Sequence, residues 1–449
     1  MRFSFFSVPV LILSTSLLMA QDAVPPAGAR PMKLADCISA ALAQNPGLQA
    51  SSSRVDAAAA NVTEARSALF PQLNVSGRAM ELSEVPAFSI TLPVVGTQTL
   101  FPSITHNYGV RASVQQVLFS GFRVMRRIDM SESNAAAVQL DYQRDRSELV
   151  VDVATGYWNL YRAMRVDTVL TETVGQLTAH LADARNFQKQ GLLTDLEVLK
   201  IETQLSEIEV KQIEARSNVR LATMRLNSLM GAPLQSVILP ADRPDDLLGD
   251  SLMHAQDVNA VMRLALARRP EVGAMHERRN MQEAAVGAAR GGWYPQLVLA
   301  ADYDYARPNS RIIPPKDQWD KSWDVGVVLQ WNVWDWFATA GQAEQARAGL
   351  QQAEAGLAQV RDGVAMDAAR SFFRLQEARE RLGAGSKGVE HAREGYRIAS
   401  QRFKVGLASN TDLLDAEVAL LQARLTKTQA QVDYAIQMEQ FKRAVGEKP

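Results

Sequence analysis

Four segments of the chain alternate apolar and polar residues with a period of two. The clearest begins with Trp323, Val325 and Val327, each followed by a residue that would face the other way. Because successive side chains of a strand point to opposite faces, this period predicts strands with one apolar face. The predicted strands cover about 71–81, 108–118, 295–306 and 323–333. Each has the length of a tilted membrane-spanning strand, about 10 residues.

Long stretches without proline, rich in Ala, Gln, Arg and Glu, follow each pair of strands. This composition favours helices. The predicted helices cover about 121–190, 194–230, 336–405 and 410–445. A helix over 121–190 would be about 100 Å long at 1.5 Å per residue. Helices of this length exceed those of ordinary globular domains and indicate coiled-coil packing.

The second half of the chain repeats the pattern of the first. Matching segments recur in the same order, with one longer loop between Leu73 and Leu118 in the first half. The clearest matches are Leu42-Ala43 with Leu266-Ala267, Pro71-Gln72-Leu73 with Pro295-Gln296-Leu297, and Gly191-Leu192 with Gly406-Leu407. A duplication of this kind predicts two structural repeats. We assign an N-terminal extension to 21–33, the first repeat to 34–231, a proline-rich linker to 232–257 and the second repeat to 258–446.

The N-terminus carries an export signal. Arg2 precedes an apolar stretch from Phe3 to Met19, and Leu18-Met19-Ala20 provides a cleavage site, so residues 1–20 are predicted to be a signal peptide. The alternative is a membrane anchor, but the stretch is short and Pro9 interrupts it. No later apolar run reaches the roughly 20 residues of a membrane helix. If the exported chain spans a membrane, it must do so as strands.

Four strands are too few to close a membrane barrel, since barrels begin at about eight strands. Open strand edges would leave backbone amides without partners in lipid. A cyclic homotrimer would supply a closed 12-stranded barrel and would place the duplicated halves in sixfold pseudo-symmetry.

Composition and charge exclude several function classes. The 449 residues carry 48 Lys and Arg against 49 Asp and Glu, which gives no basic surface for nucleic acid. The single cysteine, Cys37, cannot form an intramolecular disulfide. The five histidines are scattered without ligand spacing, and no phosphate-binding or nucleophile motif is present. We therefore expect no catalytic residues, no metal site, no cofactor and no enzymatic activity.

Three motifs in this order resemble the TolC-like outer-membrane efflux protein family. They are the opening segment from Leu34-Ala35-Asp36 to Asn45-Pro46, the strand entry Phe70-Pro71-Gln72-Leu73 with its counterpart at 294–297, and the strand-to-helix step Leu118-Phe119-Ser120-Gly121-Phe122. The resemblance covers nearly the whole mature chain. It implies a homotrimer in the outer membrane, with a long α-helical tunnel in the periplasm. It also implies a periplasmic adaptor and an inner-membrane transporter as partners.

The turns between the long helices are candidate contact sites. Glycine permits the left-handed conformation of a tight reversal, and this role alone accounts for Gly191 and Gly406. The resemblance adds that adaptor hairpins dock at such tips. The candidate docking residues are Gly191, Leu192, Thr194, Gly406, Leu407 and Ser409.

Asp412 and Asp415 follow the second turn and share one helix face. They match the acidic rings that line the periplasmic entrance of the family, so we predict that they form a gate. The alternative is that they offset the positive end of the helix dipole. The sequence departs from the family latch, because Phe403 and Ala408 replace a tyrosine and an arginine that close the entrance.

Two regions near the strands complete the expectations. The polar strand residues should face a water-filled lumen; they are Arg78, Arg111, Asp302, Asp304 and Asp324. Residues 82–107 and 307–320 should form extracellular loops. The predicted function is a passive exit duct for an efflux or type I secretion complex, with its cargo undetermined. The alternatives are a periplasmic coiled-coil scaffold without a pore and, more distantly, a secreted hydrolase.

Overall fold

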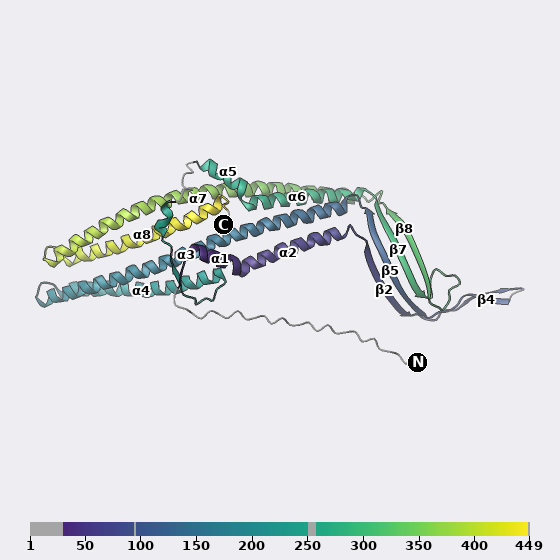
Figure 1. Ribbon diagram of the computed structural model, residues 1–449, viewed down its shortest axis with the longest axis horizontal. Helices are drawn as coiled ribbons and strands as arrows, with labels where there is room; N and C mark the ends of the chain where they lie inside the picture. Colours follow the sequence, from purple (N-terminus) through teal and green to yellow (C-terminus); the bar gives the residue numbers. More distant parts are fainter. Residues whose placement is uncertain (1–29, 94–95, 250–256, 448–449) are drawn as a thin grey trace, which may run out of the picture.

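A four-stranded antiparallel sheet lies at one end of a long helical rod (Figure 1). The computed structural model describes residues 30–93, 96–249 and 257–447. The signal peptide predicted at 1–20, and the extension up to residue 29, lie outside these residues. The strand order is β2-β5-β7-β8, with β2 at Gln72–Glu81, β5 at His106–Phe119, β7 at Gln296–Arg307 and β8 at Asp320–Gln330.

The register of the sheet separates an apolar face from a polar face. Ala112 lies opposite Tyr303, which lies opposite Trp323, and all three share the apolar face. On the polar face Arg111 lies opposite Asp304. Strands β2 and β8 each pair with one neighbour within the described chain, so the sheet has two open edges.

Two helical hairpins form the rod. The first joins α3 (Arg123–Lys189) to α4 (Asp195–Met230), and the second joins α7 (Ala338–Lys404) to α8 (Asn410–Ala444). Because α3 and α7 each have 67 residues, each is about 100 Å long. In Figure 1 both hairpin tips lie at the end of the molecule opposite the sheet.

Shorter helices complete the half of the rod nearer the sheet. In the first repeat these are α1 (Leu34–Gln44) and α2 (Pro46–Ser67); in the second they are α5 (Val258–Arg268) and α6 (Pro270–Arg290). Asn45 ends α1 and begins α2, because its side chain accepts a hydrogen bond from the Leu48 amide at 3.0 Å. Helix α2 packs on α3, and α6 packs on both α3 and α7 (Figure 1).

The strand-to-helix steps use left-handed backbone. Phe122 precedes α3 with φ 66°, and Phe337 precedes α7 with φ 67°. Residues with side chains rarely adopt this conformation. The same unusual step at the same place in both halves is the structural counterpart of the sequence duplication.

Buried apolar residues from both repeats hold the rod together. In the first repeat Tyr157 and Trp158 are fully buried beside α1 and α4. Nearer the tips, Leu177 of α3 and Ile208 of α4 share a cluster with Leu421 of α8, which joins the two hairpins. Among the described residues, no helix is both long enough and apolar enough to cross a membrane.

Two segments near the sheet differ from the sequence expectations. The alternation in β8 continues to Val333, but the strand ends at Gln330, because Gln330 pairs with Gln296, the first residue of β7. The loop at 82–107 contains a hairpin of its own, formed by β3 (Phe88–Leu92) and β4 (Gly96–Phe101).

The linker at 232–257 is also more ordered than its prolines suggest. Its strand β6 (Ile238–Pro240) pairs in parallel with β1 (Arg30–Met32) of the N-terminal extension. A 3₁₀ helix, η1, follows at Pro244–Gly249, and a second one, η3, precedes β7 at Gly291–Trp293. β1 and β6 therefore join the described ends of the extension and the linker, and β6 also contacts α3 of the rod.

Candidate functional site

The tip of the first hairpin is a tight turn around Gly191. Its φ of 76° lies in the left-handed region, and the Leu192 amide donates back to the Phe187 carbonyl at 2.9 Å. This pattern satisfies the last carbonyls of α3 and ends the helix. The turn leaves the Leu192 side chain 69% exposed at the end of the rod.

The tip of the second hairpin repeats this geometry. Gly406 has φ 73°, and the Leu407 amide donates to the Arg402 carbonyl at 2.8 Å. Leu407 is 68% exposed. Both turns lie at the same end of the molecule in Figure 1, and each exposes an equivalent apolar side chain.

Capping boxes begin the helix that follows each tip. The Thr194 amide donates to the Glu197 carboxylate at 2.9 Å, and the Ser409 amide donates to Asp412 at 3.0 Å. The Ser409 hydroxyl donates to the same carboxylate at 2.8 Å. These hydrogen bonds lower the pKa of Asp412. Thr194 and Ser409 therefore have a local structural role whatever else the tips bind.

Asp415 lies one turn beyond Asp412 and is exposed like it. Within the described chain, Asp415 forms no hydrogen bond or ion pair, whereas the Asp412 carboxylate is held by Ser409. The two predicted gate residues therefore differ in how available their charges are. Asp415 presents the freer carboxylate.

The polar face of the sheet gathers the charged strand residues predicted to face a lumen. Arg111 contacts Asp304 at 2.7 Å, and Arg311, from the loop between β7 and β8, contacts Asp324 at 2.7 Å. Arg78 and Asp302 belong to the same face by register. These contacts pair charges on an exposed surface.

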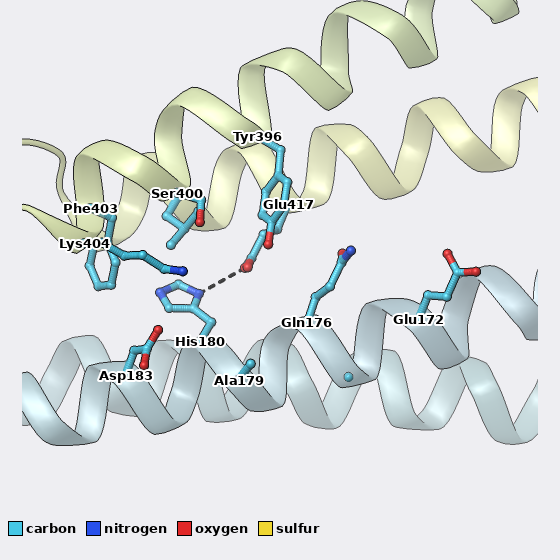
Figure 2. A pocket seen from close by; sticks show the side chains of 12 residues that line it. Glu172, Gln176, Ala179, His180, Asp183, Tyr396, Ser400, Phe403, Lys404 and Glu417 are labelled. Carbon is cyan, nitrogen blue, oxygen red and sulfur yellow. Dashed lines mark hydrogen bonds and ion pairs between the residues drawn. The ribbon is translucent and has the colours of Figure 1, made fainter.

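One cluster was missed by sequence reasoning. His180 of α3 and Glu417 of α8 form a contact of 3.1 Å from Nδ1 to Oε2, and both side chains are 3% exposed. Phe403 of α7 packs edge-on against the histidine ring, with centroids 5.1 Å apart (Figure 2). A groove of about 520 Å³ adjoins the three residues.

A sequence signal for this cluster existed. Asn410, Glu417, Leu421 and Arg424 recur at heptad spacing along α8. A carboxylate on such a stripe predicts a buried partner on the facing helix. The helix on which that partner lies cannot be read from the spacing, so the sequence does not distinguish His180 from the other scattered histidines. No group of three metal-ligating side chains occurs in the described parts of the chain.

Comparisons with known proteins show which family has this architecture. A family model described as outer membrane efflux protein matches twice, at residues 37–232 and 261–447. CyaE of Bordetella pertussis is 29% identical over 192 residues, 43% of this chain and 38% of that protein. Outer membrane protein TolC of Escherichia coli is 21% identical over 422 residues, 90% of this chain and 80% of that protein.

A solved structure shares the fold. The outer membrane protein VceC of Vibrio cholerae superposes with a TM-score of 0.75 at 18% identity, over 92% of this chain and 96% of that one. The predicted fold class is confirmed by this likeness, and the double match of the family model agrees with the duplication. Because the family model covers most of both repeats, the chain belongs to the outer membrane efflux protein family.

Proposed function

We propose that the chain is the homotrimeric exit duct of a tripartite efflux or type I secretion complex. The coarser part of this function follows from the family: the chain is an outer-membrane channel protein for efflux or secretion, with a large periplasmic part. The trimer, the adaptor and the inner-membrane transporter are the proposed parts. The duct itself would be passive, and the inner-membrane transporter would supply the energy for export.

The sheet is the observation that carries the proposal. Its apolar face exposes large side chains to the surroundings, namely Leu73, Val75, Trp323, Val325, Val327 and Leu329. Its opposite face carries ion pairs, and both edges are open. An apolar outer face suits lipid, a polar inner face suits a water-filled lumen, and open edges in lipid require other strands to pair with them.

Three copies of the chain satisfy these requirements together. Each copy would contribute four strands, and pairing of β8 with the next copy's β2 would close a 12-stranded barrel. The test is the conductance of the purified full-length protein in planar lipid bilayers. Discrete current steps are expected from a duct, and a protein that inserts without passing current would contradict it.

We also propose that the hairpin tips dock the periplasmic adaptor. Leu192 and Leu407 support this, because they are large, apolar, equivalent in the two repeats and exposed at the end farthest from the sheet. Leu192→Cys and Leu407→Cys should crosslink to lysines of the cognate adaptor through a short reagent that carries a maleimide at one end and a succinimidyl ester at the other. Met366→Cys is the matched control, since Met366 is exposed on α7 away from the tip. Equal crosslinking at all three positions would exclude docking at the tips.

Asp412 and Asp415 are proposed to form the acidic gate. In a trimer they would place six carboxylates near the entrance, where divalent cations would bind and block current. Asp415→Asn should weaken the block more than Asp412→Asn, because the Asp412 carboxylate also serves the Ser409 cap. Asp56→Asn, an exposed change on α2, is the control. Unchanged block in the double variant would remove both residues from the gate.

A further inference from the structure

The apolar face of the sheet carries charged or titratable side chains at one end. Among the described residues of the four strands, the register places four such side chains on this face: Glu81, His106, Arg307 and Lys321. All four lie at the strand ends that point away from the rod (Figure 1). Because the rod is the periplasmic part of the chain, this end of the sheet lies toward the outer leaflet of the outer membrane.

Three of the four groups already have a partner. Arg307 donates to Asp317 of the following loop, from Nε at 2.7 Å and from Nη2 at 2.9 Å. His106 contacts Glu81 through Nδ1. Lys321 is exposed, and its ammonium group has no hydrogen bond or ion pair with the described residues. The face that suits lipid therefore presents one unpaired cation at its outer end.

Aromatic rings surround Lys321 on the same face. Tyr305 lies directly opposite it on β7, and Trp319 stacks on Tyr305 with ring centroids 5.0 Å apart. Trp323 follows two positions later on β8 and is 69% exposed. The neighbouring Asp320 points to the opposite face, because successive side chains of a strand alternate. Tyrosine and tryptophan are typical of the boundary between acyl chains and headgroups.

The position of Lys321 on the lipid face has a physical consequence. A lysine on this face costs about 2–4 kcal/mol at the middle of a bilayer and about 0–1 kcal/mol near the interface. The long apolar stem can lie along the rings while the ammonium group reaches the headgroups. An unpaired ammonium group at this depth meets the charged part of the lipid.

We propose that Lys321 and the rings around it form a binding site for a phosphate group of the phosphorylated glycolipid that makes up the outer leaflet. The ammonium group supplies a full positive charge and three donors, which complement a phosphate. Tyr305, Trp319 and Trp323 would contact the apolar part of the same lipid. This inference rests on the proposed barrel, and it adds a lipid ligand that the duct function does not require.

The competing partner is a carboxylate of a second copy, because β8 is an open edge of the sheet. In the proposed trimer the next copy's β2 would lie beside β8. The carboxylate that β2 places on this face is Glu81, and His106 of its own copy already holds it. A lipid phosphate is therefore the favoured partner of Lys321.

The experiment measures lipid bound by the full-length protein, purified in mild detergent and stripped of lipid. The probes are lipid A with both phosphates and the same lipid after removal of both. Lys321→Gln should bind the phosphorylated lipid about fivefold more weakly, the effect of one cation at an anionic membrane surface. Lys321→Arg should keep the affinity. Lys387→Gln, an equal change of charge at an exposed position of α7 in the rod, is the control.

Two further results are expected if the site recognises phosphate. Wild type and Lys321→Gln should bind the dephosphorylated lipid equally. Their difference with the phosphorylated lipid should shrink as the salt concentration rises, because exposed charges are screened. Equal binding of both lipids by the wild type would overturn the proposal, since the rings alone would then hold the lipid.

The remaining outcomes separate this site from the trimer and from the duct. If Lys321→Gln keeps its affinity for lipid but dissociates more readily into single chains without lipid, Lys321 pairs with a second copy and the lipid site is overturned. Current through planar bilayers, with equal lipid binding by wild type and Lys321→Gln, overturns the site alone. A wild type that passes no current and retains no lipid overturns the barrel together with the site.

Discussion

Replacement of Phe403 by alanine should loosen the entrance. The ring is buried, and it packs edge-on against two residues of α3: His180 at 5.1 Å and Phe187 at 5.6 Å between centroids. A buried Phe→Ala change costs about 3–5 kcal/mol. Both aromatic partners belong to the other hairpin, so we assign about half of this cost, about 2 kcal/mol, to the contact between hairpins. That loss corresponds to a roughly 30-fold shift from docked toward separated hairpins.

The assay for this prediction is the open probability of single channels in planar bilayers at constant pH. Phe403→Ala should raise it, and Phe403→Leu should fall between, because leucine keeps part of the apolar volume. Phe373→Ala is the matched control on the same helix, since Phe373 is exposed. A fall in thermal stability without any change in open probability would refute the reasoning, because the ring would then stabilise only its own hairpin.

Three further predictions concern stability and reactivity. Gly231→Ala should lower the melting temperature, because Gly231 has φ 69° and a Cβ there would lie 2.6 Å from the Gln44 carbonyl oxygen. Gly175→Ala is the control and should not lower the melting temperature, because Gly175 occupies an open helical position. Because the pKa of Asp412 is lowered, its stabilisation of α8 is fully present above the ordinary carboxyl pKa of about 4 and is lost as the pH falls through the lower pKa of the folded protein. The stability difference between wild type and Asp412→Asn should therefore vanish on acidification. Burial raises the pKa of Cys37 to about 11, so the folded protein should resist alkylation at pH 8 and react only on unfolding; rapid alkylation of the native protein would contradict this.

Much of the fold could be predicted because its signals are local. Alternation along Trp323, Val325 and Val327 depends only on the strand period, and the long helices follow from composition and absence of proline. Strand ends could be predicted less well. β8 ends at Gln330 because its partner β7 begins opposite that residue, and the sequence of one strand does not show where its partner begins. The pairing of the linker with the N-terminal extension is likewise a contact between distant segments.

The candidate site likewise contains features that could be predicted from the sequence and features that could not. The left-handed turns at Gly191 and Gly406 were predictable, since glycine at a helix reversal has a local cause. The spacing from Ser409 to Asp412 also carries a capping-box signal, which gives Asp412 a second role besides the proposed gate. The contact of His180 with Glu417 was not predictable, because it depends on how two hairpins are rotated against each other.

The most direct test of the account is the mass of the complex extracted from outer membranes in mild detergent, corrected for bound detergent. The account predicts three copies of the mature chain, because only shared strands can cover the open edges of the sheet in lipid. A water-soluble monomer or dimer would contradict it, since the exposed Leu, Val and Trp face of the sheet would then have no membrane to meet.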